Sequence, residues 1–190
     1  MFLEKAGESP ATPEAGTGES SDTGSTYRTA VKMTAVLTAA GIAGRVALQH
    51  IPSVETVLPM AVAAGFFYGS RYGFASGAAG FFATNFLVWG GQGPWTVFQV
   101  LGAGAAGASG GLMGVLSERP EAFFASLVAG TLIFETAVNL GSLAYTPWAA
   151  ASPLTYLAAA LPFAGIHIAS SIGFGSIIYG IDGKLESIVG

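Results

Sequence analysis

The chain contains no cysteine, only two histidines and very few charged residues. The absence of cysteine excludes disulfide bonds, thiol catalysis and cysteine-ligated metal sites. His50 and His167 are too few for a histidine-rich metal site. Charged residues make up 9% of the 190 residues, against about 25% in soluble domains. An ordinary soluble domain is therefore not expected.

Long uncharged segments account for this low charge. No charged residue occurs in 72–117 or in 136–166, and 52% of all residues are hydrophobic. An apolar helix of ~20 residues crosses a bilayer core of ~30 Å. A membrane β-barrel would require alternation at every second residue, which these segments do not show. The sequence predicts an all-α, multi-pass membrane protein.

Glycine, proline and charged residues divide the apolar segments into six predicted transmembrane helices. Their predicted bounds, uncertain by ~2–4 residues, are 28–48, 55–69, 72–90, 95–117, 120–143 and 158–181. The second is short, because a helix rises only ~1.5 Å per residue and this one reaches ~22 Å. It is either an incomplete span or follows a loop that dips into the protein.

The first 27 residues differ in composition from the rest. They are rich in Glu, Ser, Thr, Gly and Pro, which cannot bury enough apolar surface to order a chain. Five acids and one base give residues 1–27 a net charge of −4, whereas six acids and six bases cancel in the remainder. We predict a disordered acidic tail over 1–27 and a six-helix membrane domain over 28–190.

The basic residues favour one orientation in the membrane. In a six-span topology one side carries six of the seven bases, namely Lys5, Arg28, Lys32, Arg71, Arg119 and Lys184. Arg45 alone lies towards the other side. Because cytoplasmic loops carry an excess of Lys and Arg, we expect both termini in the cytoplasm.

The predicted outer side carries most of the unusual polar and aromatic residues, in segments 49–55, 91–95 and 144–157. Binding residues concentrate in loops on a rigid scaffold. The candidate binding residues on this side are Arg45, His50, Glu55, Gln92, Trp95, Gln99 and Tyr145, with Trp148 and Tyr156 nearby. Two alternatives stay open: the Trp and Tyr residues could form an interfacial belt, and Gln92 could belong to a solvated turn.

Four further candidate binding residues are polar and lie within the predicted helices: Asn85, Glu135, Asn139 and His167. Glu135 and Asn139 are four residues apart and share a helix face. Ionisable groups inside a membrane usually face a bundle interior or a cavity. Glu135 could pair with Arg45 or His167 to hold the bundle together, contact a ligand or relay protons. His167 could equally be a structural core residue.

Small residues recur at a spacing of four in two helices, a pattern that lets helices approach closely. In 95–117 these residues are Gly102, Ala106, Gly110 and Gly114, and we expect them to pack internally. In 28–48 they are Ala35, Ala39 and Ala43. This second set suits either internal packing or an external helical partner.

Sequence motifs do not support an enzyme. The chain has no Walker A sequence, no H-E-x-x-H and no G-x-S-x-G. The "GAGAAG" of 102–107 fits G-x-G-x-x-G but lies inside a predicted membrane helix with no preceding strand. We expect no catalysis, no cofactor or metal site and no nucleic-acid binding. Active transport would take its energy from partner subunits or an ion gradient.

Two stretches, "IPSVETVLPMAVAAGFFYGSRYGFASGAAGFFATNF" and "GQGPWTVFQVLGAGAAGASGGLMG", resemble the substrate-binding S components of energy-coupling factor transporters. The resemblance covers roughly residues 35–114 and is most specific at G-Q-G-P-W-T. It implies high-affinity capture of a vitamin or similar micronutrient, with 49–55 as a lid and Gln92, Trp95 and Gln99 on the binding face. It also implies a transmembrane coupling subunit that docks at the Ala35-x-x-x-Ala39 motif, and ATPase subunits.

The acidic tail and the glycine-rich fourth helix depart from the family pattern. The resemblance does not identify the ligand, although "GQGPW" is similar to members assigned to cobalamin-like or other large ligands. We expect a prokaryotic plasma-membrane protein. One alternative is an autonomous proton-coupled secondary transporter or channel, in which Glu135 and His167 relay protons. A membrane scaffold without a ligand is a weaker alternative.

Overall fold

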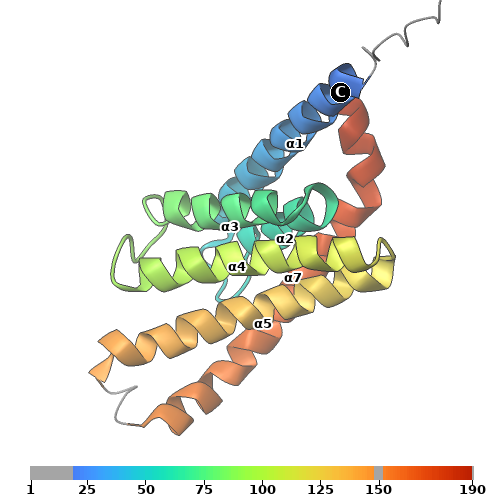
Figure 1. The fold of residues 1–190 in the computed structure, drawn as a ribbon. Helices are drawn as coiled ribbons and strands as arrows, with labels where there is room; N and C mark the ends of the chain where they lie inside the picture. Colours follow the sequence, from blue (N-terminus) through green and yellow to red (C-terminus); the bar gives the residue numbers. More distant parts are fainter. Residues whose placement is uncertain (1–18, 148–151, 190) are drawn as a thin grey trace, which may run out of the picture.

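The computed structural model describes residues 19–147 and 152–189, and these residues form helices without any strand (Figure 1). The helices are α1 (Glu19–Leu48), α2 (Val57–Tyr68), α3 (Ser70–Thr84), α4 (Trp95–Leu116), α5 (Pro120–Tyr145) and α7 (Pro153–Val189). The predicted all-α fold with six helices is confirmed for this part of the chain.

Four of these helices, α1, α4, α5 and α7, are long and apolar enough to cross a membrane. α2 has 12 residues and α3 has 15, which gives lengths of ~18 and ~22 Å. Neither reaches across a bilayer core of ~30 Å by itself. Six complete spans and cytoplasmic termini therefore stay predictions. The start of α1 and the end of α7 do lie at the same end of the molecule (Figure 1).

The predicted end of the third helix at residue 90 is wrong, because α3 ends at Thr84. Beyond it the backbone tightens into turns: Phe86 N–H donates to the Ala83 carbonyl at 3.2 Å and Leu87 N–H to the Thr84 carbonyl at 2.8 Å. Gly90 then has a φ of 94°, which glycine adopts without strain. The apolar residues that follow Thr84 suggested a longer helix than the backbone forms.

The start of α1 and both ends of α7 also differ from the predicted bounds. α1 begins at Glu19, before the predicted start at residue 28, and α7 covers Pro153–Val189 instead of 158–181. Hydropathy located only the apolar part of each helix and missed its polar turns. Of the predicted disordered tail over 1–27, residues 19–27 are helical in α1, whereas residues 1–18, and Trp148, lie outside the described residues.

Glycine allows α2, α3 and α4 to pack with their backbones close together. A Cβ on Gly107 of α4 would collide with the Gly73 backbone of α3, and one on Gly65 of α2 would collide with the Gly107 carbonyl. The small residues at 102, 106 and 110 are buried, so the predicted internal packing of α4 is confirmed there. α4 also packs along α5. These helices form one tightly packed layer.

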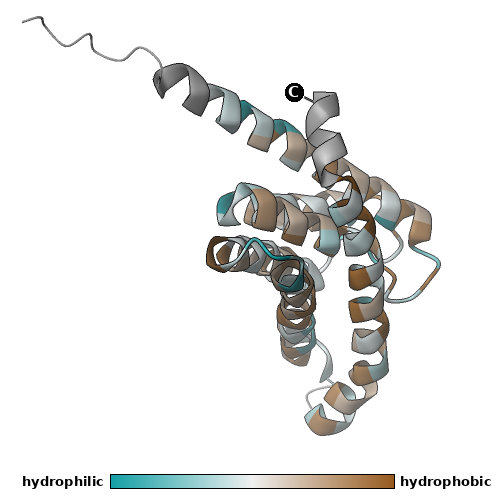
Figure 2. Cartoon of the chain, turned by 90° about the vertical axis from the view of Figure 1, so that its right-hand side faces the viewer, coloured by the Kyte–Doolittle hydropathy of each residue, from teal (hydrophilic) through white to brown (hydrophobic). Residues whose placement is uncertain are grey.

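The outer surfaces of the longer helices are largely apolar. Figure 2 shows hydrophobic residues along the helices and hydrophilic residues gathered mainly in their connections. On α7 the side chains of Leu154, Leu161 and Ile177 are exposed. α1 buries Met33 and Leu37, whereas its small residues Ala35, Ala39 and Ala43 are exposed. This distribution suits helices that contact lipid or other helices.

Candidate binding cavity

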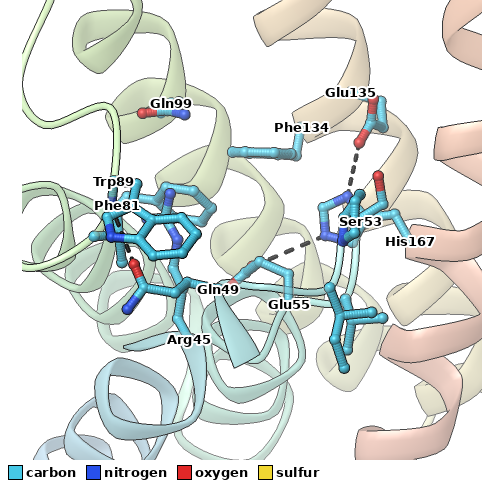
Figure 3. Close-up of a pocket in the computed structure, with 14 residues that line it drawn as sticks. Arg45, Gln49, Ser53, Glu55, Phe81, Trp89, Gln99, Phe134, Glu135 and His167 are labelled. Carbon is cyan, nitrogen blue, oxygen red and sulfur yellow. Dashed lines mark hydrogen bonds and ion pairs between the residues drawn. The ribbon is translucent and has the colours of Figure 1, made fainter. Parts of the chain in front are cut away.

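A cavity of about 290 Å³ lies where the connections 49–56 and 85–94 meet α1, α3, α4, α5 and α7 (Figure 3). Five predicted site residues line it: Arg45, Gln99, Glu55, Glu135 and His167. They come from four helices and one connection, far apart in the sequence. The fold thus brings together polar residues that the sequence analysis selected separately.

Glu55 lies at the start of α2 and is 8% exposed. Its two carboxylate oxygens accept hydrogen bonds from the backbone N–H groups of Val57, at 2.5 Å, and Leu58, at 3.1 Å. The first N–H groups of a helix have no partner within the helix, and a carboxylate there is favoured by the helix dipole. The Thr56 hydroxyl, next in sequence, donates to the Gly41 carbonyl at 2.7 Å. These contacts fix the start of α2 against α1.

His167 of α7 joins the two carboxylates of the cavity and is 3% exposed. Its Nδ1 lies 2.7 Å from Glu135 Oε1, and its Nε2 lies 3.9 Å from Glu55 Oε2. Asn139 Nδ2 donates to the other oxygen of Glu135 at 3.0 Å. The pairing of Glu135 with His167, one of the two predicted partners, is the one that forms. His167 Nε2 is buried and has no hydrogen-bond partner.

Arg45 of α1 lies on the opposite wall. Its Nη1 donates to the Thr84 hydroxyl at 2.5 Å, and its guanidinium lies 4.1 Å from the centre of the Phe81 ring. Within the described residues no carboxylate lies within 4.0 Å of this guanidinium. A cation–π contact and one hydroxyl position the guanidinium, with no ion pair.

Two amides belong to the same end of the molecule. Asn85 is 2% exposed and donates to Gln99 Oε1 at 2.7 Å, so it orients Gln99 from behind the cavity wall. Gln49 Oε1 accepts a hydrogen bond from the Trp89 backbone N–H at 3.1 Å. This bond ties the connection 49–56 to the connection 85–94.

Six predicted site residues do not line the cavity. Two of them, Asn85 and Asn139, hold cavity residues from behind, and local contacts account for the side chains of the other four. His50 packs edge-on against Trp89, with ring centroids 4.5 Å apart. Gln92 is exposed and donates to the Phe82 carbonyl at 2.9 Å. Trp95 donates to the Gly91 carbonyl at 3.2 Å, and the Tyr145 hydroxyl lies 3.0 Å from Ser142 Oγ.

Sequence reasoning missed the aromatic walls, which are Phe81, Phe134 and Trp89. The Phe81 and Phe134 rings have centroids 4.7 Å apart, and Phe134 meets the His167 ring at 5.6 Å. Each phenylalanine lies in an apolar segment, where it cannot be told from a core residue. Gln49 was detectable as the amide that begins the connection 49–55.

A second cavity of about 270 Å³ lies between α5 and α7. Glu135 and Asn139 provide much of its polarity, and the other lining residues include Leu132, Leu157 and Leu161. Glu135 thus borders both cavities. No group of three His, Asp or Glu side chains among the described residues is arranged to hold a metal ion.

No protein-family model matches the chain, and neither a curated protein nor a solved structure shows significant similarity to it. The chemistry of the cavity and the sequence resemblance over residues 35–114 are therefore the two observations that bear on function.

Proposed function

We propose that the chain is a non-enzymatic S component of an energy-coupling factor transporter, which binds a vitamin or similar micronutrient in the plasma membrane of a prokaryote. The observation that carries this proposal is the cavity between Arg45 and the Glu55–His167–Glu135 cluster. Ionisable groups inside a membrane protein are costly and usually serve a ligand, an ion or a proton. A small cavity with a few convergent polar groups is the usual form of a ligand site.

The contacts of the connection 49–56 support its proposed role as a lid. This segment provides a wall of the cavity. Its contacts with the far side include the Gln49–Trp89 hydrogen bond and a bond of 3.4 Å from the Ser170 hydroxyl to the Ser53 carbonyl. Both are single neutral hydrogen bonds, worth about 1 kcal/mol each. Separating residues 49–53 from these partners would therefore cost little compared with separating helices, while Glu55 and Thr56 stay fixed at the start of α2.

The volume of the cavity limits the size of the proposed ligand. A volume of about 290 Å³ lies at the lower end of the range for small-molecule sites, ~300–1,000 Å³. A cobalamin-like ligand is much larger than this space, because its corrin ring alone carries many bulky substituents. The volume favours a small vitamin or vitamin precursor.

The exposed small residues of α1 support a helical partner, proposed to be the transmembrane coupling subunit that works with ATPase subunits. Ala35 and Ala39 point away from the core, so a larger side chain there would disturb no internal contact. Ala35→Leu with Ala39→Leu should leave ligand binding intact and abolish uptake in cells that contain the coupling module. Retained uptake would argue against docking at this surface.

Native mass spectrometry of the full chain purified from its host tests the central proposal. We expect a small molecule bound to the chain and, under mild detergent conditions, coupling and ATPase subunits. Purified protein that carries no small molecule and no partner subunit would contradict the proposal. The same preparation identifies the ligand for the binding measurements below.

One observation favours a second candidate, an autonomous proton-coupled transporter or channel. Glu135 and His167 are in contact at 2.7 Å, and Glu135 also borders the second cavity. A proton could pass along such a pair. This candidate predicts transport by the chain alone in proteoliposomes under a pH gradient, with loss of transport in Glu135→Gln. An S component would show no transport under those conditions.

A further inference from the structure

We infer that the ligand of the cavity is a small ampholyte: a carboxylate bound by Arg45 is joined through a flat apolar body to an N–H-bearing group bound between Glu55 and His167. This inference rests on the proposed ligand-binding function and adds the chemical class of the ligand. Three observations carry it, one for each part of the molecule that would occupy the cavity.

The first observation is the cation of Arg45, which forms no ion pair with a described carboxylate. Thr84 and Phe81 hold the guanidinium in place, and Arg45 is the only Lys or Arg residue that lines the cavity within the described part of the chain. A planar guanidinium matches a carboxylate with two parallel hydrogen bonds. A single cation, opposed by two carboxylates elsewhere in the wall, fits a carboxylate better than a doubly charged phosphate.

The second observation is the set of acceptors on the other wall. His167 Nδ1 contacts Glu135 Oε1 at 2.7 Å, which leaves the other ring nitrogen, Nε2, on the side of Glu55. That Nε2 is buried without a partner. It lies 3.9 Å from Glu55 Oε2, too far for a hydrogen bond. A ligand N–H group placed here would donate to Glu55 Oε2 beside His167, and a positive charge on it would offset the carboxylates.

The third observation is the line of rings between the two walls. Arg45 lies over Phe81 at 4.1 Å, Phe81 lies 4.7 Å from Phe134, and Phe134 lies 5.6 Å from His167. Figure 3 shows Arg45 and the Glu135–His167 pair on opposite sides, with Phe134 between them. A flat apolar body would contact these rings while its two polar ends reach Arg45 and Glu55.

Three probes of nearly equal size test this assignment: 4-(aminomethyl)benzoate, 4-methylbenzoate and 4-methylbenzylamine. Binding to the purified full chain is measured by ligand-observed NMR titration at millimolar concentrations. We expect the ampholyte to bind at least about tenfold more tightly than either singly charged probe, because each charged end gains a charge-assisted hydrogen bond. Equal binding of all three probes, or no binding of any, would overturn the inference.

Single substitutions test whether Arg45 binds the carboxylate of the probe and Glu55 its amine. Arg45→Gln should remove the preference for the ampholyte over 4-methylbenzylamine, and Glu55→Gln should remove the preference over 4-methylbenzoate. Gln at position 55 keeps an oxygen that can accept from the start of α2, which protects the fold. Arg71→Gln and Glu121→Gln, both exposed and outside the cavity, are the matched controls. A merely structural role for Arg45 would weaken all three probes alike and would overturn the assignment.

The molecule that co-purifies with the chain separates the two possible failures. A co-purified molecule that lacks a carboxylate would overturn the ampholyte assignment and leave the proposed binding function standing. The absence of any co-purified molecule and partner would contradict the proposed function itself. If the co-purified molecule is an ampholyte, the derivative with a primary amide in place of its carboxylate should bind the unmodified chain at least about tenfold more weakly than the ampholyte does. In Arg45→Gln the two molecules should bind about equally. Both results together would support the ampholyte assignment and the proposed function.

Discussion

The α2–α3–α4 layer and helix α7 are built by different means. In the most apolar 18-residue stretch of α4, 39% of the residues are buried inside the protein, whereas in that of α7 only 11% are buried. Glycine contacts hold the layer backbone to backbone, for example between Gly107 and Gly73. α7 is held by fewer contacts of two kinds. The polar ones are His167 with Glu135, and the Thr131 hydroxyl of α5, which donates to Ser171 Oγ at 3.0 Å; near its other end Ile178 and Tyr179 pack against Phe123.

This difference assigns separate tasks to the two cavity walls. Phe81 and Gln99 belong to the tightly packed layer, and Arg45 is fastened to it through Thr84. His167 belongs to the lightly packed helix. Close packing leaves little freedom to the first wall, whereas the part of α7 around His167, held by a few polar side chains, can shift when a ligand replaces one of their partners. We expect the first wall to orient a ligand and the second to respond to it.

The largest expected effect comes from adding one methyl group to the packed layer. Gly107→Ala would place a Cβ against the Gly73 backbone, which cannot move aside as a flexible side chain would. We expect a loss of at least about 2 kcal/mol in the free energy of unfolding, measured by denaturant titration in micelles.

Gly165→Ala on α7 is the matched control for Gly107→Ala. A Cβ at Gly165 would meet no atom within 4 Å, and alanine favours a helix over glycine by about 1 kcal/mol. Stability should therefore stay the same or rise slightly. Equal losses at Gly107 and Gly165 would remove the distinction between the two regions.

The next effect concerns the buried ion-pair cluster. His167→Phe would leave the Glu135 carboxylate, 18% exposed, without its imidazole partner. We expect a loss of about 2–3 kcal/mol in the free energy of unfolding, since removing one member of a buried pair leaves an uncompensated charge. The measurement is urea unfolding in micelles, followed by tryptophan fluorescence.

A double variant isolates the pairwise part of that loss. Adding Glu135→Leu to His167→Phe removes both partners, so the double variant should be more stable than the sum of the two single losses predicts, by about 1 kcal/mol or more. Strict additivity would show that the His167–Glu135 contact does not hold α7 to α5.

The sequence analysis located the helices because their ends are marked chemically. Arg119 precedes α5, whose first residue is Pro120, and Pro94 precedes α4, so both starts were predicted at the residue where the helices begin. The end of α3 was missed because "FLVW" continues the apolar run after the backbone has turned. Hydropathy measures the environment of a segment and does not detect such a turn.

Part of the site followed from spacing, and part did not. Glu135 and Asn139, four residues apart, were predicted to share a face, and they form a hydrogen bond of 3.0 Å. The role of Thr84 as the partner of Arg45 was not predicted, because threonine is common in apolar helices. Phe81 and Phe134 are two of 13 phenylalanines, and only the fold shows which of them meet in a cavity.

A smaller effect is expected where hydroxyl groups join α5 and α7. Thr131→Val removes the bond to Ser171 with little change in volume. The expected loss is about 0.5–1 kcal/mol, in the range of interhelical hydrogen bonds in membranes. Thr38→Val, which removes the bond of 2.8 Å from α1 to Ser76 of the packed layer, is the comparison. If α7 is the more weakly held helix, hydrogen exchange in α7 should rise in Thr131→Val, while Thr38→Val leaves α3 protected.

The smallest effect is expected at the contact between the two connections. Gln49→Ala removes the hydrogen bond to the Trp89 N–H without touching a charged residue of the cavity. Loss of one neutral hydrogen bond of about 1 kcal/mol should raise the dissociation rate of the co-purified ligand about fivefold and leave the free energy of unfolding unchanged. His50→Ala, beside the same tryptophan but outside the cavity, should change the rate less. An unchanged rate in Gln49→Ala would mean that ligand release does not require these connections to separate, and would direct attention to the α5–α7 side.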